Sequence, residues 1–321
     1  MNKSSAKLLP IGTILLSSRA TVGECSINKK ECTTNQGFQS LIPKENISNE
    51  FVYYLIQTKR KDLIRKSCGS TFLEISANEV RKIVVSIPTI KEQDKIAKLL
   101  SLLDERIATQ NKIIEDLKKL KSAIIDYAIN SLHCDFVKFG TLYEMAGEGG
   151  TPATSNAAYY DNGNIPFIKI DDLKQKYLTE NKDFITELGL QKSSAWLIPT
   201  LSILFSNGAT IGEISITTYP VCTKQGILGI VPKQNIDVEF LYYLMSSSYF
   251  KKAVSRIVTE GTMKTAYLKD INNILCPIPT KERQQEIAKM PSALNSKIDF
   301  EQSILKLYGS QKQYLLRQMF I

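Results

Sequence analysis

The chain contains the same stretch of sequence twice, at an interval that strongly limits how it can fold. Residues 10–55 align with residues 199–244 without a gap, and 22 of these 46 positions are identical. The best shared segment runs from Thr13 to Ile27 in the first copy and from Ser202 to Ile216 in the second. The offset of 189 residues is too long for a solenoid, whose repeats recur about every 20–50 residues. The duplication therefore predicts two related modules in one polypeptide.

The similarity continues beyond this alignment. After a shared Tyr-Tyr-Leu, each copy has a basic stretch of helical character and then a short apolar segment that ends in Ile-Pro-Thr. These segments are Val84–Thr89 and Leu275–Thr280, and the offset there is 191 because two residues are inserted near Gly261. Each segment predicts a strand followed by a turn and a helix cap. In the first copy, Thr89 and Glu92 have the spacing of a capping box.

Each copy is followed by a long amphipathic helix. Residues 91–130 lack Pro and Gly and carry apolar residues at helical spacing. The predicted stripe of this first helix is Ile96, Leu99, Leu103, Ile107, Ile114, Leu117, Leu120 and Ile124. The stripe of the second helix, which starts at Lys281, is Ile287, Leu294, Ile298, Ile304, Leu305, Leu315 and Leu316. Pro291 and Gly309 predict a kink or a break in the second helix.

The two stripes can be buried if the helices pack on each other as an antiparallel coiled coil. Four further apolar residues of the first helix remain available for a second interface: Leu100, Leu102, Ile113 and Ile125. The sequence thus predicts an α+β fold in four segments, with modules over residues 1–88 and 134–279 and helices over residues 89–133 and 280–321. The second module has a lead-in from about Phe136 to Leu197, whereas only eight residues precede Leu9. We therefore expect the first module to lack about 60 residues that the second contains.

The composition favours a soluble globular protein. Hydrophobic residues make up 43% and charged residues 23% of the chain. No apolar run approaches the roughly 20 residues that a bilayer span requires, so no membrane association is expected. The apolar N-terminus superficially resembles a signal peptide, but the same pattern recurs inside the chain at Leu201 to Ser206, which favours a strand. The net charge of +9 makes a polyanionic partner such as nucleic acid plausible.

The cysteines and the single histidine argue against several catalytic and metal sites. The six cysteines form no Cys-x-x-Cys pair, and His133 is the only histidine. A zinc site built on Cys and His, or a Ser-His-Asp triad, is therefore poorly supported. We expect reduced, buried thiols in a cytoplasmic protein.

A set of short motifs, in one order and repeated in part, resembles the specificity subunit of type I restriction-modification systems. In the second module the motifs are Gly149–Pro152, Ile165–Lys169, Asp171–Leu173, Gly208–Gly212, Gln225-Gly226, Tyr242–Leu244, Ile278–Thr280 and Gln284 with Ile287. The resemblance covers essentially the whole chain except the start of the first module. It implies two target-recognition domains, with the first N-terminally incomplete, that each read one half of a split sequence in double-stranded DNA. It also implies that two long helices hold these domains apart and bind two methyltransferase subunits, with the restriction (motor-nuclease) subunits outside them.

The resemblance, together with residue chemistry, points to candidate DNA contacts. Lys and Arg suit phosphates, while Gln and short polar side chains suit base edges. The candidates are Thr151, Lys169, Gln225, Thr262 and Lys264 in the second module, and Arg19, Gln36, Lys59, Arg60 and Thr71 in the first. Ordinary polar turns, solvated lysines and a solvated helix face remain the alternatives at these positions. The glycines near residues 208–212 and the paired tyrosines are expected to serve the turn and the core instead.

The helices supply the candidate subunit-binding and spacer residues. These are Leu99, Leu103, Ile107, Ile114, Leu117, Ile124, Ile287, Leu294, Ile298, Leu305 and Leu315.

No motif for catalysis, a cofactor or a metal is recognisable. The chain lacks the Asp-or-Asn-Pro-Pro-aromatic motif of an amino-methyltransferase and a Walker lysine. Asp171-Asp172 is expected to cap a helix rather than bind magnesium. The sequence therefore predicts a non-catalytic specificity subunit. The competing hypothesis is a protein-interaction scaffold, or an inactive truncated subunit whose first module does not read DNA.

Overall fold

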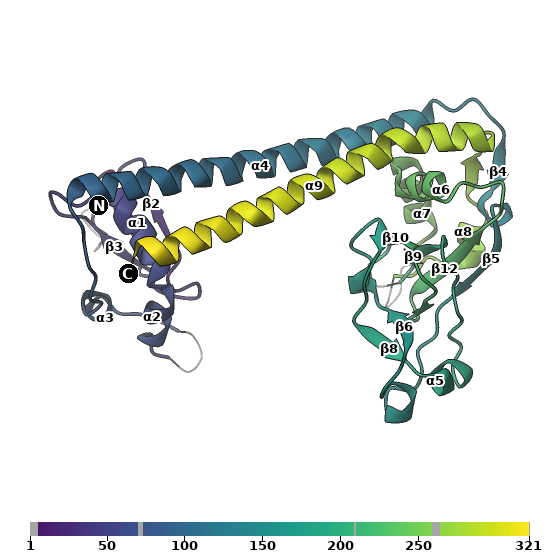
Figure 1. The fold of residues 1–321 in the computed structure, drawn as a ribbon, viewed down its shortest axis with the longest axis horizontal. Coiled ribbons are helices and arrows are strands. Elements are labelled where there is room, and N and C mark those ends of the chain that lie inside the picture. The colour runs from purple at the N-terminus through teal and green to yellow at the C-terminus, as the bar shows by residue number, and fades with distance from the viewer. Residues whose placement is uncertain (1–5, 70–72, 209, 259–263, 321) are drawn as a thin grey trace. The chain divides into compact units, whose positions relative to one another are not determined.

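The computed structural model describes residues 6–69, 73–208, 210–258 and 264–320. The chain divides into two compact units, Met1–Glu115 with Phe300–Ile321 (unit 1) and Asp116–Asp299 (unit 2). Both units combine helices with sheets, which confirms the predicted α+β fold (Figure 1). Two long helices, α4 (Ile90–Asn130) and α9 (Lys281–Met319), each contribute one part to unit 1 and another to unit 2.

Unit 1 is built on a small antiparallel sheet of order β2-β1-β3. Its strands are β1 (Ile14–Ser17), β2 (Cys25–Ile27) and β3 (Phe38–Leu41), and its short helices are α1 (Asn49–Thr58), α2 (Arg60–Arg65) and α3 (Ala77–Arg81). Ile14 and Leu16 of β1 are fully buried against α1 and α2, where Ile56 and Leu63 complete the core. The apolar N-terminal stretch is thus a strand, as the internal repeat predicts.

Unit 2 holds a five-stranded sheet of order β5-β12-β9-β10-β7, a three-stranded sheet of order β11-β6-β8 and the pair β13-β4. The strands are β4 (Phe136–Lys138), β5 (Tyr143–Glu148), β6 (Ile165–Ile168), β7 (Tyr177–Leu178), β8 (Asp183–Ile185), β9 (Ile203–Ser206), β10 (Ile214–Thr217), β11 (Cys222–Thr223), β12 (Ile227–Pro232) and β13 (Leu275–Pro277). The helices are α5 (Glu187–Gln191), α6 (Val238–Ser246), α7 (Ser248–Ile257) and α8 (Leu268–Ile271). The largest core of the unit lies between the five-stranded sheet and α6, α7 and the start of α9.

The duplicated sequence produces duplicated contacts. Gln93, near the start of α4, accepts a hydrogen bond from the Ser48 amide (2.9 Å), and its own amide donates to the Pro88 carbonyl (2.9 Å). Gln284, near the start of α9, makes the equivalent bonds with the Asp237 amide (2.8 Å) and the Pro279 carbonyl (2.9 Å). Both glutamine side chains are buried, so each ties a long helix to its own module.

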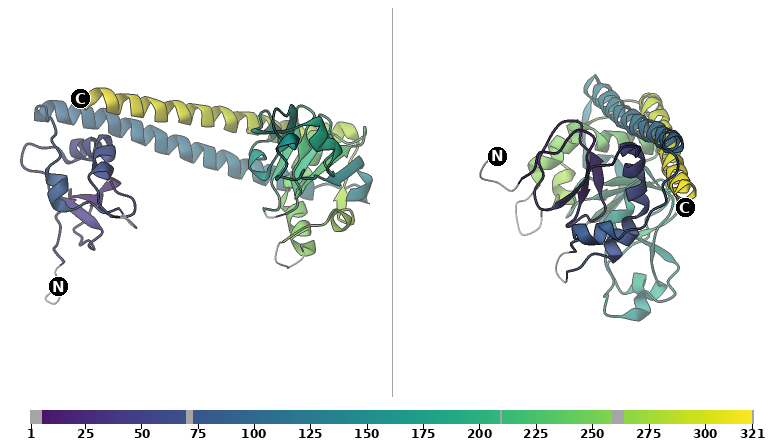
Figure 2. Two further views of the ribbon diagram at one scale, coloured as in Figure 1. Left: turned by 90° about the horizontal axis from the view of Figure 1, so that it is seen from below. Right: turned by 90° about the vertical axis from the view of Figure 1, so that its left-hand side faces the viewer.

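Parts of the two long helices pack antiparallel within each unit (Figures 1 and 2). In unit 1, buried Gln110 donates hydrogen bonds to Glu301, and Lys312 forms an ion pair with Asp104 (2.6 Å). In unit 2, Lys121 donates to Asn295 (2.8 Å). Polar contacts inside an otherwise apolar seam favour a single helix register.

Helix α9 is continuous through Pro291 and Gly309, so the predicted break is absent. A proline in a helix interior removes one backbone hydrogen bond. Tertiary contacts of the next residue hold the helix in place, because Ser292 accepts a hydrogen bond from Lys176 (2.9 Å) and donates one to Glu239. Lys176 also forms an ion pair with Glu239 (3.0 Å) and is buried beside the Tyr243 ring.

The buried stripe of α4 differs in part from the predicted one. Leu103 and Ile114 are buried, as expected, but Leu99 and Leu120 are exposed. Leu100 and Ile125, which were expected to be surplus, are 0% and 5% exposed. The packing seam is therefore shifted by one residue near both ends of the helix, because contacts with α1 in unit 1 and the large core in unit 2 select the buried face.

Two further expectations are only half right. Leu275–Pro277 forms strand β13, but residues 83–89 of the first copy are not a strand. The thiols of Cys222 and Cys276 are buried, whereas Cys68 is exposed and the other three cysteines are half-buried; all six are free. None of the described helices is long and apolar enough to cross a membrane.

Candidate nucleic-acid interface

One end of the unit 2 sheets brings several predicted DNA contacts onto neighbouring loops. Strands β9 and β5 end there, β12 begins there, and their loops are joined by backbone hydrogen bonds. The Asn207 and Gly208 amides both donate to the Gly226 carbonyl (3.0 and 3.3 Å), and the Gly226 amide donates to Glu148 (2.8 Å). These bonds hold the loops on a rigid sheet, which suits a surface that must present side chains precisely.

Thr151 and Gln225 meet on this end. The Gln225 amide donates to the Thr151 hydroxyl (3.3 Å), and the Gln225 side chain is exposed. Gly149 allows this approach, since a Cβ at that position would lie 2.2 Å from the Thr223 carbonyl oxygen. Gly149 and Gly150 are buried, so this segment is a packed turn.

Lys169 joins the same group through the pairing of β11 with β6. The Lys224 amide donates to the Ile168 carbonyl (2.9 Å), so exposed Lys224 lies next to the strand end that carries Lys169. Lys169 itself forms an ion pair with Asp183 (2.8 Å), and about half of its side chain is exposed. Sequence reasoning did not select Lys224, although its place beside the repeated Gln-Gly pair was a usable signal.

The expected capping role of Asp172 is confirmed, because its carboxylate accepts a hydrogen bond from the Lys169 amide (2.9 Å) at the start of a short 3-10 helix. Within the described ranges, no group of three or more Cys, His, Asp or Glu residues is placed to hold a metal ion.

Lys264 lies on the next loop. It is exposed, and the Ala266 amide two residues later donates to the Asn207 carbonyl (2.9 Å). Four candidates therefore come together: Thr151, Lys169, Gln225 and Lys264. Thr262 and Thr71 lie outside the described residues.

Unit 1 repeats part of this arrangement. The Ser18 amide donates to the Gly37 carbonyl (2.8 Å), as Asn207 does to Gly226, and this bond brings the loops of Arg19 and Gln36 together. Gln36 is exposed. Arg19 is held by an ion pair with Glu74 (2.9 Å). Of these two candidates, Gln36 has the freer side chain.

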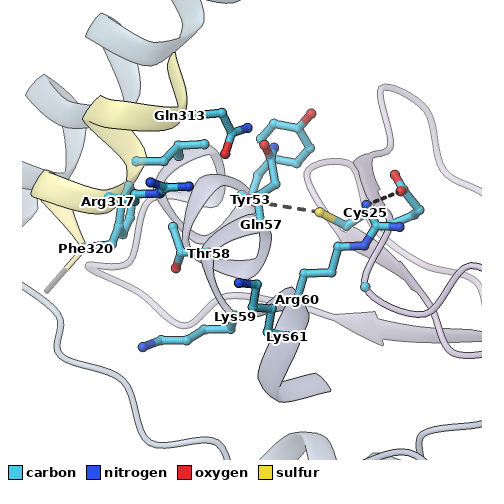
Figure 3. A pocket seen from close by; sticks show the side chains of 13 residues that line it. Cys25, Tyr53, Gln57, Thr58, Lys59, Arg60, Lys61, Gln313, Arg317 and Phe320 are labelled. Carbon is cyan, nitrogen blue, oxygen red and sulfur yellow. Dashed lines mark hydrogen bonds and ion pairs between the residues drawn. The ribbon is translucent and has the colours of Figure 1, made fainter. Parts of the chain in front are cut away.

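Lys59 and Arg60 line a separate pocket of unit 1 with a volume of about 650 Å³ (Figure 3). Lys61 and Arg317 line it too, so four cationic residues border the pocket. Arg60 is partly neutralised by Glu24 (2.8 Å). Cys25 lies at the edge of the pocket, where burial, with a smaller effect of Glu24, raises the pKa of its thiol to about 11. The thiol is therefore protonated near neutral pH and a poor nucleophile, so the pocket is suited to anion binding and not to thiol chemistry.

The helix candidates fall into two groups. Leu103, Ile114, Ile287 and Ile298 are buried in the helix seams, and Ile107, Leu117, Ile124, Leu294, Leu305 and Leu315 are half-buried. Leu99 is exposed, and Ile113, Leu120 and Tyr127 are exposed apolar residues at heptad spacing on the same helix; the heptad position between Leu99 and Ile113 is Arg106. The tyrosines of the repeat are packed, as expected, since Tyr54 and Tyr243 are 3% and 1% exposed.

Comparison with known proteins identifies the family. The profile of the type I restriction modification DNA specificity domain matches residues 1–119 and 134–307. The chain is 28% identical to the MjaIX specificity subunit of Methanocaldococcus jannaschii, over 99% of this chain and 79% of that protein. It is 24% identical to the EcoR124I/EcoR124II specificity subunit of Escherichia coli, over 75% of this chain and 62% of that protein.

Solved structures agree on the fold. The S subunit of a type I restriction-modification system from Mycoplasma genitalium has a TM-score of 0.61 at 18% identity, and the match covers 98% of this chain and 84% of that one. A chain from a structural study of complex assembly in the type I system gives 0.66 at 15% identity, over 99% and 84%.

The chain belongs to the type I restriction-modification specificity subunit family. It is thus a specificity subunit and not a catalytic one, and the scaffold alternative loses its support.

Proposed function

We propose that residues 134–279 form a module that reads one half of a bipartite DNA target with the loops around Gly226. The module over residues 1–88 reads the other half. The helical segments 89–133 and 280–321 set the spacing and bind two methyltransferase subunits, with restriction subunits bound through the resulting complex. The single observation that carries the proposal is the convergence of Thr151, Lys169, Gln225 and Lys264 on the loops at one end of unit 2.

The chemistry of these loops suits both components of DNA recognition. Lys224 and Lys264 are exposed cations for phosphates. The exposed amide of Gln225 can donate and accept at once, which matches the N6 and N7 edge of adenine in the major groove. In unit 1, Gln36 and the cations at Lys59 and Arg60 have the same complementary chemistry.

The exposed row Ile113, Leu120 and Tyr127 of α4 supports the docking of a partner subunit. Isolated apolar residues are common on protein surfaces, but a row at heptad spacing is the pattern with which helices bind other helices.

A selection experiment tests DNA reading directly. The purified chain with its methyltransferase partner is incubated with duplexes of randomised sequence, and bound DNA is sequenced. We expect one short half-site to be enriched by the second module. Gln225→Ala should relax the preference at one base position by about 1–3 kcal/mol. Gln311→Ala, at an exposed position of α9, serves as the matched control and should leave the preference unchanged. A library with no enriched sequence would refute the proposal.

A further inference from the structure

The loops at the proposed DNA interface of unit 2 carry an exposed carboxylate beside the residue that is suited to read a base. Glu148 is the last residue of β5, and its carboxylate accepts a hydrogen bond from the Gly226 amide (2.8 Å). The preceding amide, that of Gln225, donates to the Thr151 hydroxyl (3.3 Å). Two successive amides of one turn are thus bound to the segment that ends β5. This arrangement places Glu148 next to Gln225.

The turn itself does not require a negative charge. In unit 1 the counterpart of Gly226 at the offset of 189 is Gly37, and its amide donates to the side-chain oxygen of Asn35 (2.9 Å). A neutral acceptor two residues away therefore satisfies the same backbone donor. The charge of Glu148 consequently has a purpose other than the fold of the turn.

This charge also opposes the binding of DNA phosphates. The cations on the neighbouring loops are Lys169, Lys224 and Lys264, which suit phosphate contacts. A carboxylate among them repels the phosphates and reduces that attraction. Among the described residues, the Glu148 carboxylate has no ion-pair partner and no hydrogen bond other than that of the Gly226 amide. One of its oxygens is therefore held by the turn, while the other is left for a donor from outside the chain.

The donor that fits a carboxylate in the major groove is an amino group. An ionised carboxylate only accepts hydrogen bonds. Cytosine presents its N4 amino group in the major groove, whereas thymine presents the O4 acceptor and guanine the O6 and N7 acceptors. Adenine presents a donor and an acceptor side by side, which suits the amide of Gln225 better than a carboxylate. A carboxylate in a fixed position thus favours cytosine and repels thymine and guanine.

We propose that Glu148 is a specificity-determining residue that accepts a hydrogen bond from the N4 amino group of a cytosine in the half-site of unit 2. The inference rests on the proposed function, because it names one base contact of the same loops. The bond from the Gly226 amide fixes the carboxylate in one orientation, as base reading requires. The negative charge weakens binding to all other sequences and is compensated only where the amino group is present.

Glu148→Gln tests the proposal, because the variant keeps the size of the side chain and an oxygen for the Gly226 amide. With this oxygen engaged, the amide nitrogen faces the base and requires an acceptor. Wild type and variant, each with the methyltransferase partner, are compared by selection from randomised duplexes. At one position the enriched base should change from cytosine to thymine or guanine. The preference for cytosine should fall at least about fivefold, the lower end of what one base contact contributes.

Binding to duplexes that lack the half-site should move in the opposite direction. Glu148→Gln should bind them more tightly at low salt, because a charge of the same sign as the phosphates is removed. Glu144→Gln, at an exposed position of the same strand, is the matched control with the same charge change. It should leave the preferred base at every position unaltered. Circular dichroism verifies that both variants are folded.

The possible results separate this inference from the proposed function. A wild-type chain that enriches no sequence refutes DNA reading and the role of Glu148 together. A wild-type half-site that is unaltered in Glu148→Gln, or that contains no preferred cytosine, overturns the role of Glu148 alone. A uniform loss of preference at all positions in Glu148→Gln also overturns it, since the side chain would then only hold the turn.

Discussion

At the scale of single residues, the repeated glutamines show how a polar side chain can organise an α+β module. Gln93 and Gln284 are each 1% exposed. Gln93 connects the start of α4 to the N-cap of α1, and Gln284 connects the start of α9 to the N-cap of α6. Neither side chain stands out from the many glutamines of the chain by composition. Only its recurrence after Ile-Pro-Thr in both copies singles it out.

Gln93→Ala should destabilise the chain by about 1–2 kcal/mol, because the half-buried Ser48 amide and Pro88 carbonyl would lose their partner. Urea unfolding followed by circular dichroism measures the change. Gln311→Ala, at an exposed position, should shift stability by less than about 0.5 kcal/mol. Equal effects of the two substitutions would contradict the role of the buried amide.

Lys264→Ala should weaken DNA binding to a similar extent on all sequences and lower the salt slope by about one, since one phosphate contact is lost. Titrations at several salt concentrations give the slope. Lys118→Ala, on an exposed face of α4, is the control with the same charge change and should leave the slope unaltered. An unchanged slope for Lys264→Ala would mean that this side chain does not contact phosphate.

At the scale of elements, the helices were predictable in extent but not fully in the face that they bury. The lack of Pro and Gly over residues 91–130 predicted α4 almost to its ends. Leu99 and Leu100 fit the helical spacing of apolar residues almost equally well. Only the contact with Tyr54 and Leu316 determines that Leu100 is the buried one. In the same region, burial and a hydrogen bond to Asp104 raise the pKa of Tyr54 above its usual value, so this tyrosine is a neutral donor at physiological pH.

Leu100→Ala should therefore cost about 2–5 kcal/mol through lost packing and a residual cavity. Leu99→Ala, one position away in the same helix, should cost less than about 0.5 kcal/mol because its side chain is 43% exposed. Thermal or urea unfolding of the two variants distinguishes these effects. If Leu99→Ala were the more destabilising substitution, Leu99 would be the buried residue, as the helical spacing in the sequence predicts.

At the scale of the whole chain, the duplication accounts for the repeated sheets, the repeated glutamine hydrogen bonds and the two long helices. The differences between the units lie in the segment that precedes the shared strands of the second module. Unit 2 has counterparts of β1, β2 and β3 in β9, β10 and β12, and adds strands on both edges of that sheet. The described part of unit 1 has the three shared strands alone.

Removing one heptad from each long helix should shorten the spacing between half-sites by about three base pairs. Seven helical residues rise about 10.5 Å, and a DNA base pair rises about 3.4 Å. Selection from randomised duplexes measures the spacing. Removal of a heptad from α4 alone is the control, and it should impair assembly because it shifts polar pairs such as Lys121 and Asn295 out of register. Unaltered spacing in the double deletion would contradict the spacer role.

The sequence by itself determined the duplication, the fold class, the long helices and the family, because these depend on periodicity and on motif order along the chain. It also indicated which residue types could contact DNA. Only the tertiary structure decided that Thr151, Lys169, Gln225 and Lys264 share neighbouring loops, and that Lys224 belongs with them. The strand that the sequence predicts at Val84–Ser86 is absent from the structure, since a strand requires a partner, and the hydrogen bonds of a sheet lie between segments distant in sequence.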